Sequence, residues 1–238
     1  MKIKRNQKIE RTSKKQGPNG TPVKAAPKPN IGTQIIPKER YTSRDYMHQE
    51  WDKLWTKVWL LACREEDLPE PGDHYVTEIG VESILLVRQK DMSVRAFYNV
   101  CQHRGNKLVH SFEQPQEAAQ SFKCKYHDWE YGLDGGFVDI PDLETFPQGA
   151  PDCSGLTSLP CDSWGSFVWF SLNPDVEPLK DYLGIIPEHL NPYHFERMVL
   201  TKTLTVEWDC NWKASVDAFN ESYHVQGIHK QLLYYLDD

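Results

Sequence analysis

The chain has 238 residues, a formal net charge of −7 and 39% hydrophobic residues, which is enough apolar material for the core of one large domain or two small ones. Its six cysteines do not form a disulfide framework, since Cys63, Cys153, Cys161 and Cys210 are scattered without a repeating spacing and are expected to be buried free thiols. No apolar run is long enough for a membrane span and no signal-peptide core follows the basic N-terminus, so we expect a cytoplasmic protein without a membrane partner.

Positive charge is concentrated in the first 40 residues. They hold eleven Lys or Arg against two Glu, a charge of +9, so the remaining body carries −16. Five prolines and few large apolar residues accompany this charge, a composition that predicts a disordered tail over residues 1–40. A basic run can bind nucleic acid, but no aromatic residue is interleaved with this one, so we favour a solvated tail and expect no nucleic-acid partner.

The first regular elements are expected after residue 40. Ser43 can cap a helix over residues 41–61, whose apolar face would comprise Tyr46, Trp51, Trp55, Val58 and Trp59. Five runs with strand character follow, at residues 74–79, 83–88, 94–99, 121–124 and 166–172. They predict a small antiparallel β domain over residues 62–172, with residues 141–160 mostly in surface loop.

The composition changes again after Asn173, where a further region, residues 173–238, is expected to begin. Residues 178–184 predict a short helix, and the alternating pattern of residues 200–208 predicts a half-buried strand. Residues 211 to about 224 have helical character.

Two short Cys/His pairs carry the strongest chemical signal. One residue separates Cys101 from His103, and two separate Cys124 from His127. In a Rieske [2Fe-2S] cluster two thiolates bind one iron and two imidazoles bind the other, so each pair would supply one ligand to each iron. Zinc also accepts two Cys and two His, but its paired ligands usually lie roughly two to five residues apart, which favours the cluster. A third possibility, that buried cysteines lie near surface histidines by chance, would require the same coincidence in both pairs.

The residues around these pairs extend the signal. Segments 101–105 (CQHRG) and 124–129 (CKYHDW) resemble the two cluster loops of the Rieske non-heme iron oxygenase family, which includes the large subunits of aromatic-ring-hydroxylating dioxygenases. Twenty residues separate His103 from Cys124, and the polar stretch 113–120 is expected to form a lengthened turn between the loops. We expect Gly105 to permit a tight backbone near the sulfurs and Trp129 to shield the cluster, with ordinary turn and core roles as the alternative.

A second motif lies within residues 211–229. Asp217, Glu221 and His224 fall at i, i+4 and i+7, which places them on one face of an ideal helix. His229 is about 140° away from His224 on that helix. Gly227 can end or distort the helix, which would let both imidazoles face one ion.

This motif, Asn-Trp-Lys followed by an acidic residue, Tyr-His and a second His, resembles the mononuclear iron motif of the same family. The resemblance implies that His224 and His229 bind Fe(II) and that Glu221 links the two metal centres, whereas Ala218 departs from a frequent Asn. The alternative is that His224 and His229 are surface or capping histidines and that Glu221 is solvated. The family's third ligand, an Asp, lies far downstream, and Asp237 and Asp238 are too close to match it. We therefore expect a C-terminally truncated fragment, not catalytically complete by itself.

The resemblance implies an α+β fold, in which a small antiparallel β Rieske domain is joined to the beginning of an α+β helix-grip catalytic domain that includes the 41–61 helix. The activity implied is that of a terminal oxygenase, a dioxygenase or monooxygenase, with a [2Fe-2S] cluster and Fe(II) as cofactors. Its partners would be a reductase or ferredoxin, O2 and a small organic substrate, aromatic ones included, in a homotrimer or an α3β3 assembly. The electron would pass from His127 through Glu221 to His224 of a neighbouring subunit. A Rieske-type electron-transfer protein without oxygenase activity is the alternative, and it leaves the second motif unexplained.

Overall fold

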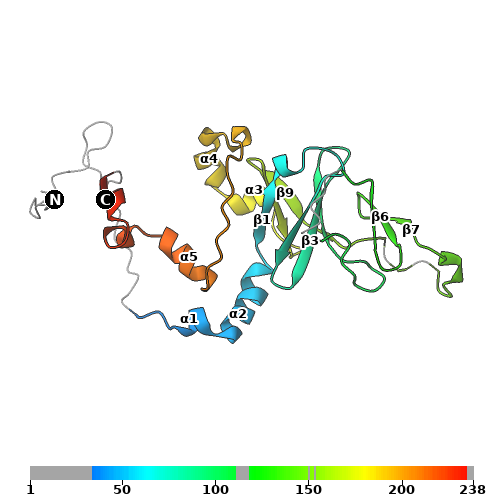
Figure 1. Ribbon diagram of the computed structural model, residues 1–238, viewed down its shortest axis with the longest axis horizontal. Coiled ribbons are helices and arrows are strands. Elements are labelled where there is room, and N and C mark those ends of the chain that lie inside the picture. Colours follow the sequence, from blue (N-terminus) through cyan, green and yellow to red (C-terminus); the bar gives the residue numbers. More distant parts are fainter. Residues whose placement is uncertain (1–33, 111–117, 150, 153, 235–238) are drawn as a thin grey trace, which may run out of the picture. The chain divides into compact units, whose positions relative to one another are not determined.

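The computed structural model describes residues 34–110, 118–149, 151–152 and 154–234 (Figure 1). Contacts divide the chain into two units, Met1–Pro37 and Lys38–Asp238, and the elements below belong to the second. The first 33 residues of the predicted tail and most of the predicted turn over 113–120 lie outside the described residues. No helix among those described is both long enough and apolar enough to cross a membrane.

Helical turns open the second unit. They are α1 (Glu39–Thr42), α2 (Arg44–Glu50) and the π-helical turn η1 (Trp51–Trp55). Ser43 caps α2 as predicted, because its Oγ accepts a hydrogen bond from the Tyr46 N–H at 3.3 Å. The prediction that the helix continues to residue 61 is wrong, since strand β1 (Trp59–Arg64) begins before it. Pairing of β1 with β10 overrides the helical spacing of the aromatic residues.

The strands form three antiparallel sheets, in the orders β1-β10-β9, β2-β3-β4-β8 and β5-β6-β7. The remaining bounds are β2 (His74–Ile79), β3 (Glu82–Arg88), β4 (Val94–Tyr98), β5 (Ser121–Lys123), β6 (Glu130–Gly132), β7 (Phe137–Asp139), β8 (Ser158–Leu159), β9 (Cys161–Trp164) and β10 (Phe167–Ser171), with 3-10 turns η2 (Glu65–Asp67) and η3 (Leu143–Thr145). All five predicted strands are confirmed to within one residue at each end, and so is a mixed α+β fold with antiparallel sheets.

Strand β3 is buried on both faces and lies between two apolar clusters. Its residues 84–87 are fully buried, and their side chains alternate between the clusters as the period of a strand requires. Leu85 and Val87 join the cluster that holds Phe122 of β5, whereas Ile84 and Leu86 join the cluster under β1 and β10. The β2-β3-β4-β8 sheet therefore supports the β5-β6-β7 sheet on one face and the β1-β10-β9 sheet on the other.

Beyond residue 173 the described chain is helical or irregular. Its elements are α3 (Leu179–Leu183), α4 (Ile186–Leu190), η4 (Asn191–Tyr193), η5 (Phe195–Arg197), α5 (Trp212–Phe219), η6 (Tyr223–Gln226) and η7 (Lys230–Tyr234). The predicted helix over 178–184 is confirmed by α3, whose Leu179 and Leu183 pack against Trp59 of β1.

The predicted strand over residues 200–208 is wrong. This segment has no strand hydrogen bonds, and its apolar side chains are exposed, Leu204 by 79%. An alternating segment becomes a strand only where a neighbour supplies both hydrogen-bond partners and an apolar layer. No segment in the described part of the chain does so for residues 200–208.

The cysteines outside the two pairs are only partly as expected. Cys63 is a buried free thiol, and burial raises its pKa to about 12. Cys161 is a partly buried free thiol, and Cys210 is exposed, so the expectation of burial is wrong for Cys210. Cys153 lies outside the described residues.

Candidate metal centres

The two predicted cluster loops close with the same pair of backbone hydrogen bonds. In each loop the cysteine N–H donates to the carbonyl of the residue five positions later. The N···O distance is 2.8 Å both for Cys101 to Asn106 and for Cys124 to Trp129. In each loop the N–H of the residue four positions after the cysteine donates back to the cysteine carbonyl. The distances are 3.0 Å from Gly105 to Cys101 and 2.9 Å from Asp128 to Cys124. Each loop is therefore a self-contained turn that presents a cysteine at its start.

The residue four positions after each cysteine has a left-handed backbone. Gly105 has φ +72° and Asp128 has φ +59°. The tight backbone expected at Gly105 is confirmed, and Asp128 takes the matching position in the second loop. Asp is one of the few residues other than Gly that adopts this conformation readily, because its short polar side chain can bond locally. The sequence analysis overlooked Asp128 because only a glycine signals a positive φ directly.

The structure brings the four predicted ligands together as two like pairs. Cys101 and Cys124 are 3% and 1% exposed, and the side chain of Cys101 is close enough to Cys124 to help lower its pKa. The rings of His103 and His127 have centroids 4.6 Å apart, and His127 is exposed to solvent. Sulfur thus faces sulfur inside the protein, and imidazole faces imidazole toward its surface. A cluster in which one iron takes both thiolates and the other both imidazoles requires this arrangement.

His103 has the features of a metal ligand. Its Nδ1 is buried and has no hydrogen-bond partner within the described ranges. Desolvation, and then the nearby charges of His127 and Arg104, lower the pKa of His103, which favours the neutral ring that metals bind. Trp129 stacks on the imidazole at 4.7 Å with 9° between the planes, and Trp129 is 4% exposed. The orphaned nitrogen and the sorted ligand pairs fit a [2Fe-2S] cluster.

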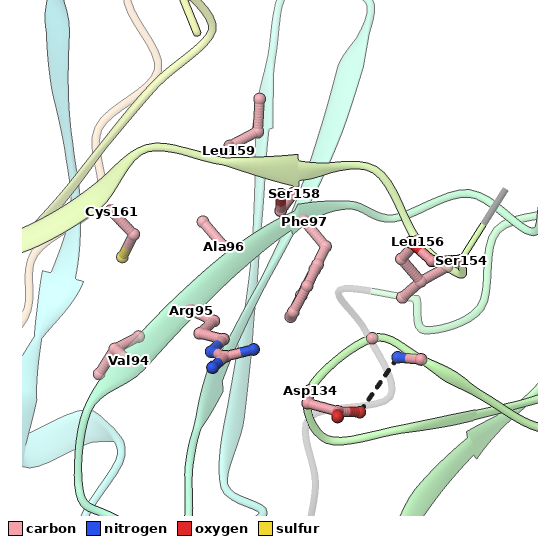
Figure 2. Close-up of a pocket in the computed structure, with 12 residues that line it drawn as sticks. Val94, Arg95, Ala96, Phe97, Asp134, Ser154, Leu156, Ser158, Leu159 and Cys161 are labelled. Carbon is pink, nitrogen blue, oxygen red and sulfur yellow. Dashed lines mark hydrogen bonds between the residues drawn. The ribbon is translucent and has the colours of Figure 1, made fainter.

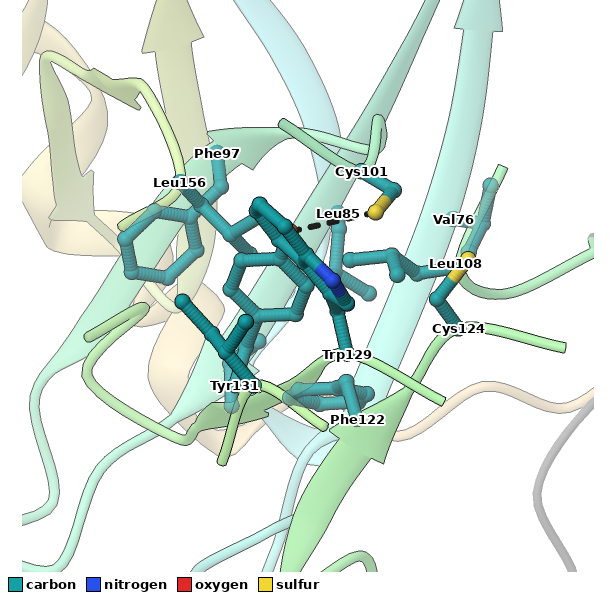
Figure 3. Packing of buried hydrophobic residues seen from close by; sticks show 12 residues of the cluster. Val76, Leu85, Phe97, Cys101, Leu108, Phe122, Cys124, Trp129, Tyr131 and Leu156 are labelled. Atoms are coloured by element: carbon teal, nitrogen blue, oxygen red, sulfur yellow. Dashed lines mark hydrogen bonds between the residues drawn. The ribbon is translucent and has the colours of Figure 1, made fainter. Parts of the chain in front are cut away.

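Tyr131 of β6 is a neighbour of the sulfurs that the sequence analysis missed. Figure 3 shows it within the apolar cluster beneath Cys101, with its hydroxyl directed at the sulfur. The hydroxyl accepts a hydrogen bond from the Gln102 N–H at 3.0 Å and lies 3.1 Å from Cys101 Sγ, to which it can donate. Burial, and then the bond to Cys101, raise the pKa of Tyr131, so the phenol keeps its proton.

Cys124 is set up to ionise. Burial opposes the thiolate, but hydrogen bonds from the Tyr126 and His127 backbone N–H groups favour it, and contacts with Cys101 and Asn106 add to them. The net effect lowers the pKa of Cys124. A thiolate is the form that binds iron.

The second motif is less regular than its sequence predicts. Asn211 caps α5, since its Oδ1 accepts from the Lys213 N–H at 3.1 Å, but the helix ends at Phe219 and not near His224. Asp217 therefore does not share a helix face with Glu221 and His224. Its carboxylate instead accepts a hydrogen bond from the Tyr41 hydroxyl at 2.7 Å.

The chain nevertheless brings Glu221, His224 and His229 together. Glu221 Oε1 lies 2.5 Å from His224 Nδ1, and its Oε2 accepts from the His224 N–H at 3.1 Å. The His224 and His229 ring centroids are 5.4 Å apart. Gly227 is the C-cap of η6, so the helical turn ends there as expected, with a right-handed backbone (φ −88°). The His229 N–H donates to Val225 O at 3.0 Å.

The carboxylate of Glu221 is held in its ionised form beside the candidate iron ligands. The hydrogen bond from His224 is the main cause that lowers the pKa of Glu221, so the carboxylate is ionised at neutral pH. No set of three or more His, Cys, Asp or Glu within the described ranges is grouped to hold a single ion. Two imidazoles with an adjoining carboxylate fit part of a mononuclear iron site, and Asp237 and Asp238 lie outside the described residues.

A cavity elsewhere in the fold is unrelated to these centres. It has a volume of about 480 Å³ and lies between β4, the turn at Asp134 and residues 154–161. Figure 2 shows Arg95 and Asp134 at its wall, with the Asp134 carboxylate accepting a hydrogen bond from the Gly136 N–H. None of the seven predicted site residues lines it.

Two protein-family models match the chain. Residues 58–160 match the Rieske [2Fe-2S] domain, and residues 195–237 match the catalytic domain of the ring hydroxylating alpha subunit. The first includes both Cys/His pairs, and the second includes Glu221, His224 and His229. The two families imply a [2Fe-2S] cluster and a mononuclear Fe(II), respectively.

Curated relatives include oxygenase subunits with different substrates. The carnitine monooxygenase oxygenase subunit of Acinetobacter pittii is 28% identical over 196 residues, which are 82% of this chain and 52% of the relative. The large oxygenase component of the naphthalene 1,2-dioxygenase system of Pseudomonas aeruginosa is 32% identical over 198 residues, 79% of this chain and 43% of the relative. The chain thus spans about half the length of these relatives.

Solved structures lead to the same family. A quaternary ammonium Rieske monooxygenase in complex with L-carnitine superposes with a TM-score of 0.77 at 27% identity, over 85% of this chain and 57% of that one. A naphthalene 1,2-dioxygenase variant bound to phenanthrene gives a TM-score of 0.71 at 28% identity, over 82% of this chain and 44% of that one. With its two family matches, its paired Cys/His loops and these neighbours, the chain is similar to the large, or alpha, subunits of the Rieske non-heme iron oxygenases over about half of their length.

Proposed function

We propose that this chain acts in a terminal oxygenase that hydroxylates a small organic substrate with O2. Cys101, His103, Cys124 and His127 would hold the [2Fe-2S] cluster, and His224 and His229 would hold Fe(II) with a third ligand from outside the described residues. When bound, the cluster stores one electron and the mononuclear iron activates O2. Residues 62–172 would form the Rieske domain, and residues 173–238 the beginning of a helix-grip catalytic domain.

The sorting of the cluster ligands is the observation that carries this proposal. The buried thiol pair and the imidazole pair stand ready for two different irons, and the buried Nδ1 of His103 lacks any other partner among the described atoms. A tetrahedral zinc site would instead need all four side chains around one centre.

Glu221 supplies the link between the centres. Its carboxylate already binds the His224 imidazole, and its side chain is 44% exposed, so it can accept a second imidazole N–H. His127 is exposed at the tip of its loop, and within the described residues no contact joins it to Glu221. We place the partner subunit's Glu221 next to His127 in a trimer or α3β3 assembly, which gives the electron a hydrogen-bonded route between subunits.

The proposed partners follow from this chemistry. A reductase or ferredoxin would deliver electrons at the exposed His127, and the substrate would be a small organic molecule. The relatives include both a carnitine monooxygenase and a naphthalene 1,2-dioxygenase. The three described cysteines outside the cluster loops, Cys63, Cys161 and Cys210, are free thiols, which supports a cytoplasmic location.

Iron and acid-labile sulfide assays with EPR spectroscopy test the assignment. Three irons and two sulfides per chain are expected for the oxygenase, with a rhombic Rieske signal after reduction. Two irons with that signal would favour the electron-transfer alternative or a fragment that lacks the third ligand of the mononuclear iron. A zinc-only protein would contradict both functions.

The route through Glu221 can be tested by Glu221→Gln in the assembled oxygenase. The variant should keep the cluster's absorption and EPR spectra, because no cluster ligand changes, and should slow cluster reoxidation by O2 at least about tenfold, since the neutral amide holds both imidazoles less well. Rapid-mixing spectroscopy gives the rate. Glu188→Gln, on the exposed face of α4, is the matched control, and an unchanged rate in Glu221→Gln would remove Glu221 from the route.

A further inference from the structure

Lys213 is the one residue of α5 that is buried. Its side chain is 5% exposed, and its Nζ lies 2.7 Å from Oε1 of Glu50, whose side chain is 11% exposed. Glu50 ends α2, near the start of the folded chain, so this ion pair joins two elements that are distant in the sequence. Burying two charges costs desolvation free energy, so a gain in stability alone does not explain this ion pair.

Aromatic rings surround the ammonium group. Nζ lies 5.2 Å from the Trp212 ring centroid, 5.4 Å from that of Tyr46 and 5.7 Å from that of Tyr41. Apart from the ion pair, Nζ has no partner with hydrogen-bond geometry among the described residues. Three rings within about 6 Å attract a cation through their negative faces. The site is therefore specific for a positively charged side chain.

Further contacts hold the same two segments together. Trp212 Nε1 donates to Glu50 Oε2 at 3.4 Å, and the Trp212 ring packs edge-on against Trp55 with centroids 4.9 Å apart. Tyr41 donates its hydroxyl to Asp217, on the next turn of α5. Glu50 thus receives contacts from two neighbouring residues of α5, and the aromatic residues close around them.

The remainder of α5 has little to hold it. The helix has eight residues, and Val216 and Phe219 are 44% and 84% exposed. So short a helix is marginal in water without tertiary contacts. The chain passes from its C-terminus directly into Glu221 and His224, so the direction of α5 sets where these side chains lie.

We propose that Lys213 is the positioning residue of the mononuclear iron site. Through Glu50 and the aromatic rings it fixes α5 on the N-terminal helical segment, and thereby fixes the turn that presents Glu221, His224 and His229. This inference rests on the proposed function, because it assigns to those residues the binding of iron.

The test compares Lys213→Gln, Lys213→Arg and the matched control Lys202→Gln, an exposed lysine in the irregular segment before α5, in the cluster-loaded full chain. Fe2+ is added anaerobically, and non-cluster iron is measured by equilibrium dialysis. Lys213→Gln should weaken Fe2+ binding roughly 10- to 100-fold, as loss of a group that supports metal ligands does. Lys213→Arg should recover most of the affinity because it keeps the cation, and Lys202→Gln should match the wild type.

Hydrogen exchange of the same proteins separates positioning from general stability. Lys213→Gln should speed exchange in residues 212–229 and leave β3 unchanged. Equal Fe2+ affinity in Lys213→Gln and wild type, failure of Lys213→Arg to recover it, or faster exchange in β3 as well would overturn the proposal. If the wild type binds no non-cluster Fe2+, this chain lacks a ligand that the iron site needs, or the site is wrongly assigned. The positioning role then stands or falls on whether exchange in residues 212–229 changes in Lys213→Gln.

Discussion

Tyr131 places its hydroxyl beside the sulfur of Cys101, one of the two predicted cysteine ligands of the cluster. It is fully buried, lies 3.1 Å from Cys101 Sγ and is oriented by the Gln102 N–H. A hydrogen bond to sulfur stabilises the more negative, reduced state of a cluster and so raises its reduction potential. Tyr131 is therefore expected to tune the potential without binding iron.

Replacing Tyr131 by Phe tests this expectation. The loss of one hydrogen bond of about 1 kcal/mol corresponds to a potential lower by roughly 40 mV for a one-electron couple. A redox titration followed by EPR measures the shift. Tyr75→Phe, on β2, removes a hydroxyl for which no contact with Cys101 or Cys124 is found, and its potential should be that of the wild type. An equal potential in Tyr131→Phe would show that the hydroxyl does not donate to the sulfur.

At this scale the sequence predicts ligands better than their neighbours. The Cys/His pairs are identifiable because covalent spacing alone limits which metals they can share. Tyr131 and Asp128 had no such signal, since the hydrogen bond of the first and the left-handed backbone of the second depend on the folded loops. Glu221 and His224 are close for a reason different from the one inferred, a turn after α5 and not a shared helix face.

Among the elements, the matched cluster loops are the most constrained. Both depend on a left-handed residue four positions after the cysteine, and only one of the two is a glycine. A β-branched residue at Asp128 would be strained there, whereas Gly would not.

Asp128→Val should therefore destabilise the second loop by about 1–2 kcal/mol. Asp128→Gly, the control with the same loss of charge, should leave the stability and the cluster content close to those of the wild type. Thermal unfolding followed at the cluster's visible absorption measures both. Equal melting temperatures for the two variants would contradict the role assigned to the backbone of Asp128.

The elements that the sequence predicted correctly are those whose apolar pattern is satisfied by their neighbours. Strand β3 is enclosed on both faces, and its bounds follow from its residues. Residues 200–208 have an equally clear alternation and remain exposed. The start of β1 was misassigned because Trp51, Trp55 and Trp59 fit a helix locally, while pairing with β10 decides the outcome.

For the whole molecule, Arg64 joins the region of the first family match to the start of the second. Its Nη2 donates to the carbonyls of Phe195 and Met198, both at 3.0 Å, and its guanidinium lies 4.9 Å from the Phe167 ring centroid. One side chain from β1 thus holds the turn η5 on the β1-β10-β9 sheet.

Arg64→Lys should release this turn, because a single ammonium group lacks the planar fork that bonds two carbonyls and stacks on a ring. Faster hydrogen exchange is expected over residues 195–199, with the loss of roughly 1 kcal/mol per hydrogen bond, while cluster content stays unchanged. Arg197→Lys is the control, since the Arg197 side chain is 76% exposed. Unchanged exchange in Arg64→Lys would show that other contacts suffice.

Contacts between distant segments are where prediction from this sequence ends. The ion pair of Glu50 with Lys213 and the hydrogen bond of Tyr41 with Asp217 join residues whose local patterns give no sign of each other. The helical pattern identified α2 and part of α5, but periodicity describes one element at a time and does not say which partner its face meets.

The local closure of the two cluster loops has a consequence for how this protein can vary. Because each loop is completed by its own two hydrogen bonds, the chain after Asn106 and before Cys124 takes no part in closing either turn. Insertions or deletions between the loops are therefore tolerated as long as both strands still reach the sheet, whereas one residue added inside a loop would separate a cysteine from its closing carbonyl. The wide spacing between His103 and Cys124 is thus a permitted change of linker length, and an affinity tag or a fluorophore placed there would leave the cluster intact.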